Sequence, residues 1–161
     1  MHTSKWQVDA VRRLLMAGAT SRLDRMLSKL QPADLAALFS ELSPGEIKVL
    51  VDELFSTARA GMTLRELPRD ILPSILELIE DNRIAQILER IETDDATVFL
   101  HALDEERSSP ILDLVPEPRQ QELRWQLLYG EETAGSVMTP KVLTVDPATN
   151  AEQAIDRIRT H

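Results

Sequence analysis

The sequence predicts an all-α protein, folded as a right- or left-wound superhelical stack of short helices with a repeat of about 12 residues. Two observations predict this fold. Residues typical of turns and helix starts recur along the chain, whereas strand signals are nearly absent before residue 136. Apolar anchor positions also recur every twelve residues, with one extra residue after the third; they are Leu30, Leu42, Leu54, Leu67, Ile79, Ile91, Leu103, Val115 and Leu127.

Two helices are expected before this repeat. Residues 4–17 have the apolar spacing of one amphipathic helix, and Gly18 is its expected stop. A second helix is expected from about Ser21 to Leu30, with Ser21 as a possible N-cap. Together, residues 1–29 form the basic leading helices of a predicted helical domain over residues 1–130.

Each block of the repeat is expected to be a short turn followed by about two turns of helix. Ser43, Thr93 and Asp104 are residue types that favour the N-cap, and proline is tolerated in the first helical turn. Helices this short are unstable alone and must stack on their neighbours. An irregular helical bundle with the same spacing is the alternative. Residues 56–63 interrupt the period, which predicts a longer loop or a shifted helix there.

Composition and charge restrict the possible functions. The 161 residues include no cysteine, which excludes disulfides, thiolate metal sites and a cysteine nucleophile. The 18 basic and 27 acidic residues give a net charge of −9, which argues against a nucleic-acid partner. No apolar run approaches the roughly 18 residues of a membrane span. Motifs of phosphate loops, zinc helices and nucleophile elbows are missing, so we expect no enzyme and no catalytic residues.

The charge is unevenly distributed along the chain. Residues 1–29 hold six bases and two acids, a net of +4, and the remaining 132 residues hold 12 bases and 25 acids, a net of −13. The basic helices could pair with the acidic body or with a membrane surface, although two solvated helix faces would also explain the pattern. Trp6, Phe99 and Trp125 fall on apolar stripes, so we expect all three in the core.

The character of the sequence changes near residue 130. Residues 131–136 are a plausible hinge, residues 142–145 are a short β-rich run, and a helix with Ala154, Ile155 and Ile158 on one face follows. Thr149 or Asn150 could cap that helix. Residues 137–161 resemble the opening of a cystathionine-β-synthase (CBS) domain. The chain stops at residue 161, inside this motif, so we expect a truncated CBS strand-helix segment and a fragment of a larger protein.

Three stretches resemble the N-terminal region of the MgtE family of magnesium transporters: LQPADLAAL at 30–38, ILERIETDDA at 87–96 and GEETAGSVMTP at 130–140. The resemblance covers roughly residues 20–161. It implies a superhelical N domain on the cytoplasmic side of the cell membrane, followed by a CBS pair and a transmembrane domain as partners. It further implies a homodimer in the parent protein that senses intracellular Mg²⁺ and closes a pore when Mg²⁺ is abundant.

Asp94 and Asp95 are the candidate metal ligands, because this pair opens a predicted helix and matches paired acids of the family. Mg²⁺ prefers oxygen ligands and needs only one or two carboxylates. In the alternative interpretation, Asp94 caps the helix, Asp95 is a first-turn acid and no metal binds. Low Mg²⁺ occupancy is expected in the isolated chain.

Other candidate ligands are weaker. Asp104, Glu105 and Glu106 form a second acidic turn, whereas His2, His101 and His161 lack ligand spacing. At residues 56–62 the chain departs from the family pattern, because it lacks the further acids that the resemblance places nearby. A protein-interaction scaffold attached to a soluble CBS protein is the alternative function.

Overall fold

The computed structural model describes residues 5–130, 133–138 and 144–160. These residues form helices joined by short turns, and no strand occurs among them. The α-helices are α1 (Lys5–Met16), α2 (Thr20–Leu27), α3 (Pro32–Phe39), α4 (Pro44–Ser56), α5 (Ala60–Leu64), α6 (Leu72–Leu76), α7 (Asp81–Arg90), α8 (Thr93–Ala102), α9 (Glu105–Asp113), α10 (Arg119–Leu127) and α11 (Ala151–Arg159). One 3-10 helix, η1 (Ala134–Val137), follows α10. The all-α prediction is confirmed for the described residues.

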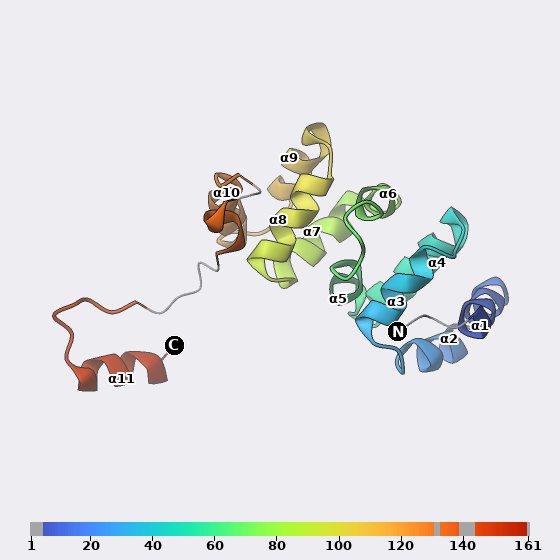
Figure 1. The fold of residues 1–161 in the computed structure, drawn as a ribbon, viewed down its shortest axis with the longest axis horizontal. Coiled ribbons are helices and arrows are strands. Elements are labelled where there is room, and N and C mark those ends of the chain that lie inside the picture. The colour runs from blue at the N-terminus through green and yellow to red at the C-terminus, as the bar shows by residue number, and fades with distance from the viewer. Residues whose placement is uncertain (1–4, 131–132, 139–143, 161) are drawn as a thin grey trace.

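The helices from α1 to α10 form an extended array, with α1 and α2 at one end and α10 toward the other (Figure 1). Along most of it, each helix packs on the helix after next. One series runs α3, α5, α7, α9, and a second runs α6, α8, α10. Whether the array winds as a superhelix stays a prediction.

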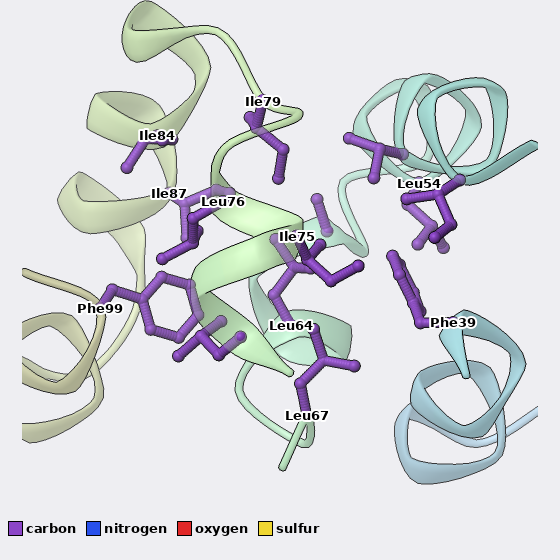
Figure 2. Close-up of a cluster of buried hydrophobic side chains, with 14 of the residues drawn as sticks. Phe39, Leu54, Leu64, Leu67, Ile75, Leu76, Ile79, Ile84, Ile87 and Phe99 are labelled. Carbon is purple, nitrogen blue, oxygen red and sulfur yellow. The ribbon is translucent and has the colours of Figure 1, made fainter. Parts of the chain in front are cut away.

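The residues at the twelve-residue spacing form part of the hydrophobic core or pack against it. All nine anchor positions are buried or pack against buried side chains. The apolar residue eight positions after an anchor is buried as well, as seen at Leu38, Leu50, Ile75, Ile87, Phe99, Ile111 and Leu123. Several of these side chains meet in one cluster between α5, α6, α7 and α8 (Figure 2). Each short helix is therefore stabilised by apolar area that it buries against other helices.

The two predicted N-terminal helices are present, but the predicted cap of the second one is wrong. Gly18 ends α1 in the left-handed conformation, with φ of 60°. Its amide donates to the Leu15 carbonyl, as expected for a helix stop. The second helix begins at Thr20, after an N-cap at Ala19, and ends at Leu27. The predicted Ser21 cap is therefore wrong, because Ser21 already lies in the first turn.

The start of α4 shows how a predicted cap forms. Glu46 accepts hydrogen bonds from the backbone amide and from the hydroxyl of Ser43, both at 2.8 Å. It also accepts from Arg12 Nε at 2.9 Å, so α1 is joined to the start of α4. These hydrogen bonds from Ser43, together with the Arg12 charge, lower the pKa of Glu46 below its usual value.

The interruption at residues 56–63 is a shifted helix and not a long loop. The chain turns at Ala58, whose φ is 55°, and α5 starts at Ala60. A Cβ on Gly61 would lie 2.7 Å from Ile91 Cγ2, so only glycine fits without moving the Ile91 side chain. After α5, the next helix starts at Leu72 and not directly after Pro68 as its block predicts.

Three arginine side chains hydrogen-bond to main-chain carbonyls at the C-terminal ends of helices earlier in the chain. Each donates to two main-chain carbonyls three residues apart, where a helix ends and carbonyls lack helical partners. The sets are Arg59 with Leu27 and Leu30, Arg107 with Leu76 and Ile79, and Arg119 with Leu88 and Ile91. The second carbonyl always belongs to an anchor position, 28 or 29 residues before the arginine. We call these contacts the arginine closures.

The tryptophans depart from the prediction. Phe99 is 1% exposed and confirms its expected place in the core, but Trp6 is 65% and Trp125 is 42% exposed. Trp125 contacts the Tyr129 ring edge-on, with centroids 5.1 Å apart. An apolar stripe does not distinguish a residue at its buried centre from one at its exposed margin.

The residues after α10 contact the helical array. The buried Gln126 side chain donates to the carbonyls of Gly135, at 2.7 Å, and Met138, at 3.1 Å. The predicted hinge falls partly on 131–132, outside the described residues, and its role stays a prediction. In the predicted strand, positions 142 and 143 also lie outside the described residues, and Thr144 and Val145 are irregular.

Helix α11 confirms the last predicted helix. Between the two expected caps, Asn150 is the one used. Its side chain accepts from the Gln153 amide at 2.9 Å. Ile155 and Ile158 are exposed, so the apolar face of α11 packs on none of the described residues.

Candidate metal-binding carboxylates on helix α8

Asp94 and Asp95 are the second and third residues of α8, whose N-cap is Glu92. The expected alternative role of Asp94 as a cap is therefore wrong, and Thr93 is likewise inside the helix. Thr93 is buried and its hydroxyl is held by Glu122 and Arg119 of α10. The pair remains at a helix start, where the dipole favours negative charge.

The two carboxylates have different surroundings. Asp94 is exposed, whereas the Asp95 side chain is 28% exposed and lies 3.3 Å from Arg65, just beyond α5. Arg65 also contacts Glu66 at 3.6 Å. Burial raises the pKa of Asp95, and the nearby charges of Asp94, Glu92 and Glu66 raise it further, against the opposing effect of Arg65. Arg65 thus faces several acids, and we call Asp95, Arg65 and Glu66 the acidic corner.

The position of Asp95 in the repeat is informative. Asp95 follows the anchor Leu67 by 28 residues, the separation between Arg107 and Ile79 and between Arg119 and Ile91. At the corresponding place after Ile79 and Ile91, a guanidinium donates to the carbonyls at a helix end. Here the side chain is a carboxylate. Asp95 therefore places an acid where three other joints, those of Arg59, Arg107 and Arg119, place a base.

The chemistry of this corner suits a hard cation only in part. Carboxylate oxygens are what Mg²⁺ and Ca²⁺ prefer. Within the described part of the chain, however, no three histidine or acidic side chains are grouped so that they could hold a metal ion. Asp94 and Asp95 can thus supply two carboxylates, and further ligands would have to come from water or from outside the described residues.

The other candidates stay dispersed. Asp104 is the N-cap of α9, with Glu105 and Glu106 exposed in its first turn. His101 lies in the last turn of α8, where a base complements the dipole. His2 and His161 lie outside the described residues.

Sequence reasoning missed the contact between Asp95 and Arg65. The two residues are thirty positions apart, and no local motif marks the pair. The separation of 28 residues between anchors and closing arginines is the signal that could have indicated it.

Beside the repeat interruption, a cavity of about 220 Å³ is bordered by Phe55, Met62, Ile87 and Arg90. Its lining is mostly apolar, and it includes neither of the two aspartates. Among the described residues, no acidic side chain lines this cavity, and several of its lining residues belong to the stretch 56–62, where the chain lacks the acids expected from the family pattern.

Replacing Asp95 by asparagine is expected to stabilise the protein at pH 7. The folded-state pKa of Asp95 is raised, so its charged form disfavours folding, and the wild-type protein gains stability as pH falls through that pKa. The advantage of Asp95→Asn should therefore shrink toward pH values of about 4. Urea unfolding at both pH values measures it, with Asp104→Asn as the exposed control. A less stable Asp95→Asn protein at pH 7 would contradict this assignment.

The chain was compared with known proteins. The model of the family described as MgtE intracellular N domain matches residues 30–132. The structure of the soluble part of a magnesium transporter is 18% identical, with a TM-score of 0.77, over 97% of this chain and 61% of that one. The cytosolic domain of the Mg²⁺ channel MgtE in complex with ATP is 26% identical, with a TM-score of 0.79, over 95% and 62%.

The chain spans about three-fifths of the length of both solved structures. No curated protein matches it. Among the described helices, none has both the length and the apolar character needed to cross a bilayer. Because the family match extends over more than half of the sequence and includes the acidic corner, this chain belongs to the MgtE intracellular N-domain family.

Proposed function

We propose that the chain is the regulatory domain of a magnesium transporter or channel, on the cytoplasmic side of the membrane, and that Asp94 and Asp95 take part in sensing Mg²⁺. The observation that carries the proposal is the acidic corner. An acid stands where three other blocks of the repeat use arginine, and its charge is held at a cost in folding free energy. The family and the fold of a Mg²⁺ channel domain support the same function.

The donor set fits magnesium used as a regulatory ligand. Mg²⁺ keeps several of its waters and binds through one or two carboxylates, which is what Asp94 and Asp95 offer. Further acids would come from the CBS pair, the transmembrane domain or a second copy in a homodimer. In this proposal the array winds as a superhelix, and residues 137–161 begin the CBS domain.

The charges of Asp94 and Asp95 explain how the two residues would act. Without a cation, they repel any acidic surface brought against α8, and the compact arrangement of the parent protein is disfavoured. A bound divalent cation neutralises this repulsion, so it binds the compact state better and shifts the population toward it. Asp94 and Asp95 are thus positioned to make closure depend on Mg²⁺ concentration.

The test is carried out in the parent transporter. Replacing both Asp94 and Asp95 by asparagine should raise the Mg²⁺ concentration that closes the pore by roughly tenfold, within the usual range of coupling energies. Mg²⁺ flux into liposomes at stepped internal Mg²⁺ measures the effect. The matched control is Glu105→Gln with Glu106→Gln, which removes two charges from the next acidic turn.

Amide NMR spectra of the isolated chain give a second measurement. Millimolar MgCl₂ should shift amides near Asp94 and Asp95 more than those near Glu105, with NaCl at equal ionic strength as the reference. Unchanged closure in the double asparagine variant, or equal loss in the control, would contradict the proposed role of the two aspartates.

A scaffold function is the second candidate. It is favoured by exposed apolar side chains near the end of the array, namely Trp125 at 42%, Leu128 at 80% and Leu114 at 49% exposure. Such a surface suits a protein partner. A scaffold would respond to its partner independently of Mg²⁺, so the flux experiment separates the two functions.

A further inference from the structure

The outward faces of α1 and α2 differ from the rest of this acidic protein. They lie in the segment with a net charge of +4, whereas the remainder carries −13. Both helices bury their apolar stripes, made by Val8, Val11 and Leu15 in α1 and by Leu23 and Leu27 in α2. What remains outside is a basic surface with two large apolar side chains.

Helix α1 contributes the apolar part of this surface. Trp6, Arg13 and Met16 are seven and three residues apart, which places them on one side of the helix, away from the buried stripe. Trp6 is 65% exposed and Met16 is 80% exposed. An indole, a guanidinium and a thioether thus share one solvent-facing stripe.

Helix α2 contributes the basic part. Arg22 and Arg25, with Lys29 just beyond the helix end, are three and four residues apart and all exposed. Among the described residues, none of these three cations forms an ion pair with an acid. Their charges are therefore available to a partner.

The pair of helices is fixed to the body and sits at its end. Helix α1 packs on α2 and α4, and Arg12 of α1 joins Glu46 and the Glu41 carbonyl. In Figure 1, α1 and α2 occupy the end of the array opposite α10, away from α8 and α9. A flat anionic surface can therefore approach this end without meeting the acidic helix starts of α8 and α9.

We propose that the exposed faces of α1 and α2 bind an anionic phospholipid surface, and that Trp6 and Met16 enter the headgroup region while Arg13, Arg22, Arg25 and Lys29 neutralise lipid charge. Helices that lie on membranes combine a basic face with tryptophan and other apolar residues. Indole rings favour the level of the headgroups. This inference goes beyond magnesium sensing and does not depend on it.

A membrane explains this surface better than a nucleic acid does. Binding to nucleic-acid phosphates would explain the exposed cations but not the exposed apolar side chains. Trp6 and Met16 would be buried in the interfacial region of a membrane. Each cation near an anionic bilayer strengthens binding by roughly fivefold, and this attraction is screened by salt. The four named cations are therefore sufficient for measurable binding.

The experiment uses the whole 161-residue chain and vesicles of phosphatidylcholine, with or without about one third phosphatidylserine. Trp125→Phe leaves Trp6 as the only tryptophan, so its emission reports this face alone. Cosedimentation should show binding to the anionic vesicles only, with a blue shift of Trp6 emission, and binding should weaken with added salt. Arg22→Gln, Arg25→Gln and Lys29→Gln together should weaken it roughly 100-fold.

A matched triple variant removes the same charge elsewhere. Lys48→Gln, Arg69→Gln and Arg90→Gln replace three exposed cations outside α1 and α2, and should retain binding. Circular dichroism checks that both triple variants are folded. The proposal would be overturned if both triple variants lost binding equally, or if the chain bound neutral vesicles as well as anionic ones. It would also be overturned if Trp6 emission did not change on binding, or if the chain bound single-stranded poly-uridine RNA in place of vesicles.

Discussion

Replacing Arg119 by alanine is expected to lower the free energy of unfolding by about 3 kcal/mol, because a nearly buried guanidinium with several partners is removed. The Arg119 side chain is 11% exposed and forms an ion pair with Glu122 at 3.0 Å. Its closure also satisfies carbonyls at the end of α7, and Nη1 donates to the Thr93 hydroxyl at 2.7 Å. Urea unfolding followed by circular dichroism measures the loss.

Two further variants separate the contributions of Arg119. Arg124→Ala removes an arginine of the same helix whose partner, Asp113, is at the surface, and should cost less than about 1 kcal/mol. Arg119→Lys retains the charge but lacks the planar donor fork, so it should fall between wild type and Arg119→Ala. Similar losses in Arg119→Ala and Arg124→Ala would mean that the closure adds little.

Replacing Phe99 by alanine is expected to cost about 3 to 5 kcal/mol, the usual range for removing a buried aromatic ring. Phe99 is 1% exposed and belongs to the cluster shown in Figure 2 with Leu76 and Ile87. A domain is stabilised by about 5 to 15 kcal/mol in all, so this one substitution removes a large share. The midpoint of urea unfolding should fall sharply.

The control for Phe99 is Val49→Ala in α4, because Val49 is 45% exposed. That change should stay within about 0.5 kcal/mol. The buried core runs from Val8 to Leu123 as one cluster, so both variants should unfold in a single transition with an unchanged denaturant slope. A second transition in Phe99→Ala would show that the array unfolds in parts.

Sequence could predict the features of this fold that depend on local chemistry. Ser43 caps α4 because a hydroxyl followed by glutamate at the third helical position satisfies exposed amides. Gly18 ends α1 because the left-handed turn strains other residues. The anchor positions are buried, or pack against buried side chains, because their spacing repeats with the helices. These effects operate over a few residues, and the sequence displays them directly.

Features that depend on distant contacts were not predictable in the same way. The start of α8 moved two residues ahead of the expected Asp94 cap, and Thr93 became buried against Glu122 and Arg119 of α10. Trp6 and Trp125 are on the surface because none of the described helices covers them. For the site, the sequence identified Asp94 and Asp95, but only the fold shows that Arg65 lies against Asp95 and that burial raises the pKa of this acid.

The arginine closures also constrain how helices of the array can move relative to one another. Arg59 ties the end of α2 to the start of α5, and Arg107 and Arg119 tie the ends of α6 and α7 to α9 and α10. Because each of these arginines donates to two carbonyls, its closure resists relative rotation of the two helices that it joins. Between the end of α5 and the start of α8, Arg65 forms an ion pair with Asp95, and no arginine closure occurs there among the described residues. We expect the helices to rotate more easily there than at the three arginine closures, because an ion pair between two partly exposed side chains adds little stability.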